Sequence, residues 1–287
     1  MNRRLYGLFR PVFLIGAPMN QDIQPLLTRR DGAVLTLTLN RPQALNSFTG
    51  ELHDALMSAL KAAAADASVR CVILTGAGRG FCAGQDLSDP AIAPDLTPGA
   101  TPKDIGGLIE ARYKPLALML HDFPVPVVAA VNGVAAGAGA NLALNCDLVI
   151  AARSASFIQA FSKIGLIPDC GGTWLLPRLV GRAQAMALAM LGDKLPAEDA
   201  QRIGLIFRCV DDAALAADAL ALAQRLAAMP VRALAETRRA FSMADHQTLS
   251  EALTLEADVQ RRLGASGDYL EGVSAFFAKR APSFKDR

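Results

Sequence analysis

The segment "VPVVAAVNGVAAGAGANLALNCDLVIAA", residues 125–152, decides the fold class of this chain. Residues 125–133 are apolar apart from one Asn-Gly pair and predict a strand that ends at a glycine. Residues 138–145 then predict a short helix, and the apolar run 146–152 predicts a second strand. The order strand, helix, strand indicates an α/β fold.

The same order occurs earlier in the chain. Leu35, Leu37 and Leu39 alternate with threonines, which is the period of a half-buried strand. Residues 51–66 have apolar side chains at three- and four-residue spacing and predict an amphipathic helix. The run "CVILTG", residues 71–76, is continuously apolar and predicts a strand buried on both faces.

Beyond Gly181 the sequence becomes mostly helical. Amphipathic helices are predicted near residues 183–191, 197–203, 213–228, 231–243 and 249–263. An α/β core is therefore followed by a helical C-terminal part, and this surplus of helices favours contacts between subunits.

Composition describes a globular chain with a large core. Of 287 residues, 52% are hydrophobic and 20% charged, and the net charge of +2 gives no excess that would favour nucleic acid or an anionic membrane. The five cysteines are irregularly spaced, without a CxxC pair, which argues against disulfides and a zinc site. Free cysteines agree with a reduced, cytoplasmic compartment.

The N-terminal residues 1–20 begin with an apolar run that Arg10 and Pro11 interrupt, so we do not expect a signal peptide. We expect a disordered extension instead, and Met19 is a plausible alternative start. No apolar run reaches the roughly 20 residues that span a bilayer.

Residues 88–103 contain four prolines and predict a long loop rather than a helix or a central strand. A solvated insertion and a lid over a binding site explain such a loop equally well.

Two glycine-containing stretches follow predicted strands: "TGAGRGFCAGQDL", residues 75–87, and "NGVAAGAGANLAL", residues 132–144. A dinucleotide site is disfavoured because Leu142 stands where the third glycine of G-x-G-x-x-G is needed, and no glycine precedes the Lys-Ser/Thr pair of a phosphate loop. Tight packing of turns would explain both stretches. Alternatively, one backbone amide from each could bind the same carbonyl oxygen and form an oxyanion hole.

Four segments together resemble the enoyl-CoA hydratase/isomerase, or crotonase, superfamily: "GRGFCAGQDL", "NGVAAGAGANLAL", "FSKIGLIPDCGGTWLLPRLVG" and "EGVSAFFAKRAPSF". The resemblance runs from about Ile23 to the C-terminus. It implies a crotonase-like spiral of β-β-α units over residues 21–200 and a helical trimerisation region over residues 201–287. It also implies an acyl-CoA thioester as substrate, a homotrimer or dimer of trimers, and no separate cofactor or metal.

The resemblance assigns roles to individual residues. The oxyanion donors become the backbone amides of Gln85 and Ala138, and the catalytic acid becomes Asp169. Asn141 and Phe161 occupy the positions of the two glutamates that handle water in hydratases, and neither can transfer a proton as a carboxylate does. The implied substrate-binding residues are Ala44, Ala83, Asp86, Asn141, Phe161 and Lys279, with Ala44 near the adenine and Lys279 meeting a phosphate, often from a neighbouring subunit.

Asp169 is an isolated carboxylate in "GLIPDCGG", residues 165–172. From the residues alone, capping of the helix beginning near Gly172 explains it better than catalysis. The resemblance reverses that order, since burial by Ile167, Trp174 and Phe161 would raise its pKa and make it a stronger base. Asp86, judged from the residues alone, indicates a loop brace rather than a catalyst.

The other reactive residue types receive structural interpretations. His53, His121 and His246 lack the spacing of a triad or metal site, so each is expected at the surface or as a satisfied core histidine. Cys82 and Cys170 flank the expected site but have no basic neighbour that would produce a thiolate.

The motifs are similar to those of family members that convert the ring 1,2-epoxide of phenylacetyl-CoA to an oxepin in phenylacetate catabolism. We therefore expect an isomerase that works through an oxyanion-stabilised enolate and a proton shuttle at Asp169. A Δ3,Δ2-enoyl-CoA isomerase of aliphatic chains and a non-catalytic acyl-CoA-binding protein are the alternatives. A hydrolytic dehalogenase is disfavoured, because residues 87–119 contain no histidine and Phe161 replaces a tryptophan.

Overall fold

The computed structural model of the chain describes residues 24–287, so the extension expected over residues 1–20 lies outside the described part. Within that part, no single helix is long and apolar enough to cross a membrane. Residues 212–227 and 231–244 pass such a test only as a pair, bent by 99°.

The larger of two sheets has six strands in the order β1-β2-β3-β5-β7-β10. These strands are β1 (Leu26–Asp31), β2 (Val34–Leu39), β3 (Cys71–Gly76), β5 (Val127–Val131), β7 (Leu148–Ala152) and β10 (Arg208–Val210). β1 and β2 are antiparallel, and all other neighbours in this sheet are parallel. All four predicted strands belong to this sheet, and β5 is buried on both faces as its apolar run requires.

The smaller sheet has the order β4-β6-β8-β9. Its strands are short: β4 (Gly80–Cys82), β6 (Val134–Ala136), β8 (Ser156–Ile158) and β9 (Leu195–Pro196). β4, β6 and β8 run parallel, whereas β9 is antiparallel to β8. The sequence did not predict these strands, because two or three residues are too few to establish a period of two.

The chain alternates between the sheets in three β-β-α turns, which confirms the expected spiral. β3 leads to β4, β5 to β6 and β7 to β8, and helices follow each pair. These helices are α2 (Ile105–Leu108), the π-helix η2 (Ile109–Tyr113) and α3 (Lys114–His121) after β4, α4 (Ala138–Leu144) after β6, and η3 (Ala160–Ile164) and α5 (Gly172–Leu191) after β8.

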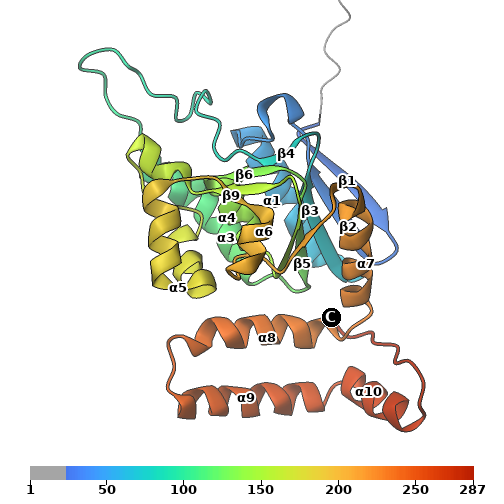
Figure 1. Cartoon of the computed structure of the whole chain (residues 1–287). Helices are drawn as coiled ribbons and strands as arrows, with labels where there is room; N and C mark the ends of the chain where they lie inside the picture. The colour runs from blue at the N-terminus through green and yellow to red at the C-terminus, as the bar shows by residue number, and fades with distance from the viewer. Residues whose placement is uncertain (1–23) are drawn as a thin grey trace, which may run out of the picture.

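The remaining helices lie outside these three turns. They are η1 (Pro42–Ala44), α1 (Gly50–Ala65), α6 (Ala197–Arg202), η4 (Asp212–Ala214), α7 (Leu215–Ala227), α8 (Val231–Ala244), α9 (Leu249–Gly264) and α10 (Gly267–Phe277). All seven helices predicted before residue 264 are present, whereas α10 was not individually predicted. Figure 1 shows α8, α9 and α10 as a layer below the body that contains both sheets.

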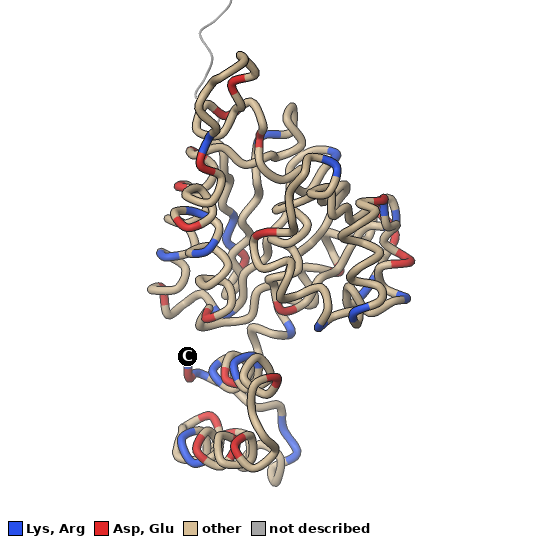
Figure 2. The backbone as a smooth tube through the Cα atoms, turned by 90° about the vertical axis from the view of Figure 1, so that its left-hand side faces the viewer, with Lys and Arg blue, Asp and Glu red and all other residues tan. Residues whose placement is uncertain are grey.

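Residues 88–103 contain neither helix nor strand, as their prolines predict, and Figure 1 shows this loop extending away from the body. Acidic and basic positions alternate over the described chain (Figure 2), with no extended region of one sign. This distribution does not suggest a nucleic-acid surface.

Candidate active site

The two glycine-containing stretches meet at one edge of the smaller sheet. β4 and β6 are parallel neighbours, so the loops after Cys82 and Ala136 leave the sheet on the same side. A Cβ atom added to Gly84 would lie 2.8 Å from the Ala136 carbonyl oxygen and 3.4 Å from the Ala138 nitrogen. Only glycine permits this approach, and at φ +91° Gly84 also has a backbone that other residues rarely adopt.

The backbone amide of Gln85 is free to bind a ligand. Phe48 bridges to this segment by donating from its N–H to the Gly84 carbonyl over 2.7 Å and accepting from the Asp86 N–H over 2.9 Å. Both bonds are made by the neighbours of Gln85. Within residues 24–287 the Gln85 N–H has no acceptor.

The second predicted donor, Ala138, is free for a different reason. It is the first residue of α4, where an amide has no carbonyl four residues earlier within the helix. The residue before it, Gly137, offers no side chain to cap the helix. The fold thus places two unsatisfied amides, those of Gln85 and Ala138, on adjoining loops.

Asp169 is half-buried, and the desolvation of its carboxyl raises the pKa of this group from 3.8 to about 6. Its Oδ1 is buried without a hydrogen-bond partner in the described chain. The capping hypothesis is wrong, because the N-cap of α5 is Gly171 and no side chain caps that helix. A buried carboxylate oxygen without a partner remains available for proton transfer.

The backbone around Asp169 is held by α4. Asn141 is fully buried, and its Nδ2 donates to the Asp169 carbonyl over 2.8 Å, while its Oδ1 accepts from Gln159 over 2.8 Å. At the C-cap of α4, Asn145 donates to the Cys170 carbonyl over 2.8 Å. The helix that begins with the Ala138 amide therefore also fixes the position of the acid.

The apolar residues expected around Asp169 divide into two groups. Phe161 is buried, and its ring lies 3.7 Å from where a Cβ on Gly137 would be, so it forms a wall beside the start of α4. Ile167 is 75% exposed, so the expectation that it desolvates Asp169 is wrong. Trp174 stacks beneath the Arg178 guanidinium, 4.2 Å from the ring centroid.

Three other expected binding residues lie on the loops near Gln85. Ala44 ends η1, and the next residue, Leu45, accepts a hydrogen bond from the Ala83 N–H over 2.9 Å. Asp86 accepts from the Ser88 hydroxyl over 2.6 Å and pairs with Arg41 over 3.0 Å, and these donors lower its pKa. Asp86 therefore braces its loop.

Lys279 is not brought to this site within one chain. It follows α10 in the C-terminal layer (Figure 1), whereas Gln85, Ala138 and Asp169 belong to the body.

Two residues near the site were not assigned a role from the sequence. Tyr113 is 1% exposed, and its hydroxyl donates to the Gln85 Oε1 over 2.6 Å. His53 is also buried, which lowers its pKa to about 4, and its Nε2 has no partner among the described residues. The expectation of a surface or satisfied histidine is therefore wrong. Neither residue belongs to a local motif that would have revealed it.

The site offers no thiolate. Burial raises the pKa of Cys82 to about 12 and also raises that of Cys170, so both thiols are neutral. Among the described residues, no group of three His, Cys, Asp or Glu side chains could hold a metal ion.

The family description "Enoyl-CoA hydratase/isomerase" matches residues 29–287. The chain belongs to this family. It is 55% identical over 259 residues to the 1,2-epoxyphenylacetyl-CoA isomerase of Escherichia coli (strain K12), covering 90% of this chain and 97% of that one. The 2,3-dehydroadipyl-CoA hydratase of the same organism is 36% identical, with coverage of 91% and 99%.

A solved structure agrees with the fold described above. The crystal structure of an enoyl-CoA hydratase from Bacillus anthracis superposes with a TM-score of 0.84 at 32% identity, covering 92% of this chain and 100% of that one. The family thus includes both hydratases and isomerases, and the residues at the site must distinguish them.

Proposed function

We propose that this chain is an acyl-CoA isomerase that converts ring-1,2-epoxyphenylacetyl-CoA to oxepin-CoA. The observation that carries the proposal is the buried Asp169 carboxyl with a free oxygen, on a segment fixed by the helix that also supplies the Ala138 amide. Asn141 and Phe161 stand where a hydratase would have glutamates, which leaves one acid. The 55% identity to an enzyme named 1,2-epoxyphenylacetyl-CoA isomerase supports this substrate.

In this proposal the Gln85 and Ala138 amides bind the thioester oxygen. Removing a proton from the carbon next to the thioester places negative charge on that oxygen. Preorganised amide donors stabilise this charge, and loss of one such donor costs about 3 kcal/mol in other enzymes. The main chain thereby makes the proton acidic enough for a carboxylate to remove.

Asp169 then moves one proton between carbons. The epoxide ring expands when its ring C–C bond breaks and gives the seven-membered oxepin. Asp169 takes the proton from the carbon between the ring and the thioester and returns it to a ring carbon. No water is consumed, and the atoms of substrate and product balance, as an isomerisation requires.

Proton exchange in heavy water tests the proposal. Incubation of an acyl-CoA thioester with the protein in D2O should place deuterium on the carbon next to the carbonyl, and Asp169→Asn should lower turnover at least about 100-fold. Asp193→Asn, which changes an exposed carboxylate beyond α5, is the control and should keep full turnover. A loss of less than tenfold in correctly folded Asp169→Asn would contradict the proposal.

The alternative is a Δ3,Δ2-enoyl-CoA isomerase that uses the same amides and acid on aliphatic chains. Parallel assays on the ring epoxide and on a 3-enoyl-CoA separate the two, and we expect a higher kcat/KM for the ring epoxide. Binding of both thioesters without turnover or exchange would favour a non-catalytic acyl-CoA-binding protein.

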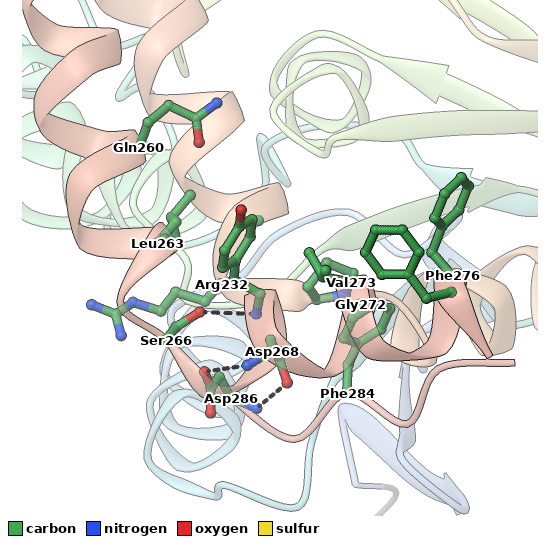
Figure 3. A pocket seen from close by; sticks show the side chains of 15 residues that line it. Arg232, Gln260, Leu263, Ser266, Asp268, Gly272, Val273, Phe276, Phe284 and Asp286 are labelled. Carbon is green, nitrogen blue, oxygen red and sulfur yellow. Dashed lines mark hydrogen bonds between the residues drawn. The ribbon is translucent and has the colours of Figure 1, made fainter. Parts of the chain in front are cut away.

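We also propose that the protein works in the cytoplasm as a homotrimer or a dimer of trimers. Large apolar side chains are exposed on the C-terminal helices, among them Phe241, Leu249, Leu270, Phe276 and Phe277. A groove of about 870 Å³ lies between α8, α9 and α10. Figure 3 presents its lining, with Val273, Phe276 and Phe284 on the last helix and the segment after it.

A second copy of the chain fits this surface best, because apolar patches of this extent usually mark protein contacts. In such an assembly Lys279 of one copy could reach a coenzyme A phosphate bound to another, as the family resemblance implies.

A further inference from the structure

The side chain of Gln85 is held at both ends of its amide group. Its Nε2 donates to the Phe48 carbonyl over 3.0 Å, and its Oε1 accepts from the Tyr113 hydroxyl over 2.6 Å. A backbone carbonyl can only accept, so it fixes which end of the amide faces Phe48. The oxygen must then face Tyr113. Burial raises the pKa of Tyr113 well above 10, which keeps the hydroxyl protonated as the donor.

Tyr113 reaches Gln85 from a different part of the chain. It is the last residue of the π-helical turn η2, a geometry that recurs at functional sites. Its ring packs edge-on against Phe48 and His53, with centroid distances of 5.8 and 4.6 Å. The phenol is therefore rigid, because its ring and its hydroxyl are both constrained.

The hydrogen bonds around Phe48 link the Gln85 side chain, which Tyr113 holds, to the free backbone amide of Gln85. Phe48 holds the peptide groups on either side of Gln85 through Gly84 and Asp86, and its carbonyl also accepts from the Gln85 side chain. Rotation of the Gln85 backbone would break these bonds. The direction of its free N–H consequently depends on contacts that end at Tyr113.

We propose that Tyr113 is a positioning residue that, through the Gln85 side chain, fixes the direction of the Gln85 amide toward the thioester oxygen. The inference rests on the proposed function. It gives a role to a side chain that touches neither the acid nor the second donor, and it explains why a glutamine stands at a position whose required group is a backbone amide.

Tyr113→Phe tests this role, because it removes one hydroxyl and retains the buried ring. We expect kcat to fall about tenfold, less than for loss of a whole donor, while KM changes less than about twofold. Gln85→Met keeps the backbone amide and should show a similar loss. The double variant should lose no more than either single variant, since both remove the same constraint.

Thr75→Val is the matched control. The Thr75 hydroxyl donates to the Ala130 carbonyl over 2.8 Å within the larger sheet, so its loss also removes one internal hydrogen bond. We expect this variant to lose stability comparable to Tyr113→Phe and to keep kcat unchanged. If kcat fell equally in Tyr113→Phe and Thr75→Val, Tyr113 would contribute only to the stability of the fold, and the inference would be overturned.

The infrared stretch of a 13C-labelled thioester carbonyl reports the oxyanion donors directly. Phenylacetyl-CoA, which has no epoxide to rearrange, should bind the wild type with its carbonyl stretch shifted to lower frequency. In Tyr113→Phe this shift should be smaller than in the wild type, whereas in Thr75→Val it should be as large as in the wild type. A full shift in Tyr113→Phe would overturn this inference alone, whereas no shift in the wild type would overturn the proposed function.

Discussion

At Asp169, no cationic neighbour within residues 24–287 offsets the desolvation that raises the pKa to about 6. The carboxyl also lacks a side-chain donor, and its Oδ1 has no partner in the described part of the chain. Desolvation of an acid without a compensating partner destabilises the folded protein, and strongly perturbed acids of this kind are typical of functional sites. The raised pKa of Asp169 predicts how both the activity and the stability of the protein depend on pH.

The pH dependence of activity should reflect ionisation of this group. A general base acts when deprotonated, so kcat/KM should rise about tenfold per pH unit below 6 and level off above it. The measurement is kcat/KM from about pH 4.5 to about pH 9, with Asp193→Asn measured in parallel. A profile that stays flat down to its acidic end would contradict Asp169 as the base.

Stability should change in the opposite direction. Between pH 3.8 and about 6 the folded chain holds the Asp169 proton more tightly than the unfolded chain, so stability falls as pH rises through that window. Above it the penalty is on the order of 2–3 kcal/mol. Asp169→Asn should therefore be more stable to urea than wild type near neutral pH, and the gain should vanish below pH 3.8. A less stable variant near neutral pH would contradict the burial argument.

At the scale of elements, α4 is the part on which both halves of the site depend. Its first amide belongs to Ala138, and Asn141 and Asn145 hold the carbonyls of the segment that carries the acid. The first turn of α5 packs directly against the Asn141 side chain. A Cβ added to Gly172 would lie 2.3 Å from the Asn141 Nδ2 and 2.9 Å from the Pro168 Cβ.

Gly172→Ala should therefore displace the Asp169 segment from α4. Overpacking typically costs 1–3 kcal/mol, so we expect a loss of about 2 kcal/mol in stability together with a fall in kcat of about tenfold or more. Urea unfolding and steady-state kinetics measure both. Thr173→Ala, an exposed change in the same turn, should leave both nearly unchanged. Equal behaviour of the two variants would show that the close approach at Gly172 is unimportant.

For the whole molecule, the separation between the body and the C-terminal layer is the dominant feature. The site is built in the body, whereas the groove of about 870 Å³ lies between α8, α9 and α10 in the layer below it (Figures 1 and 3). Phe276 and Phe277 are 78% and 79% exposed there. A function in assembly explains these side chains, since the groove does not adjoin the acid or the free amides.

The double substitution Phe276→Asp with Phe277→Asp should reduce the mass of the assembly. Two carboxylates in an apolar contact must be desolvated without partners, which disfavours association strongly. Light scattering during size-exclusion chromatography measures the mass. Leu96→Asp changes an equally exposed apolar side chain in the proline-rich loop and should leave the assembly intact. An unchanged mass in the double variant would place the subunit contact elsewhere.

Local pattern determined the elements that are long enough to have a period. The strands at residues 34–39 and 71–76 and the helix at residues 50–65 follow from alternating, continuous and helical spacing of apolar side chains. The positions of the two donor loops were also predictable, because glycines directly after strands leave backbone amides uncovered. The family resemblance added the identity of the acid.

Only the tertiary structure decided what surrounds those groups. Whether Asp169 caps a helix or lies free depended on the turn at Cys170 and Gly171 and on amides from α4, more than twenty residues earlier. The bond from Tyr113 to Gln85 joins residues 28 apart. Such contacts have no local period, because they arise where separate elements pack together. The sequence by itself determined which groups could do the chemistry, and long-range packing determined their direction and their pKa.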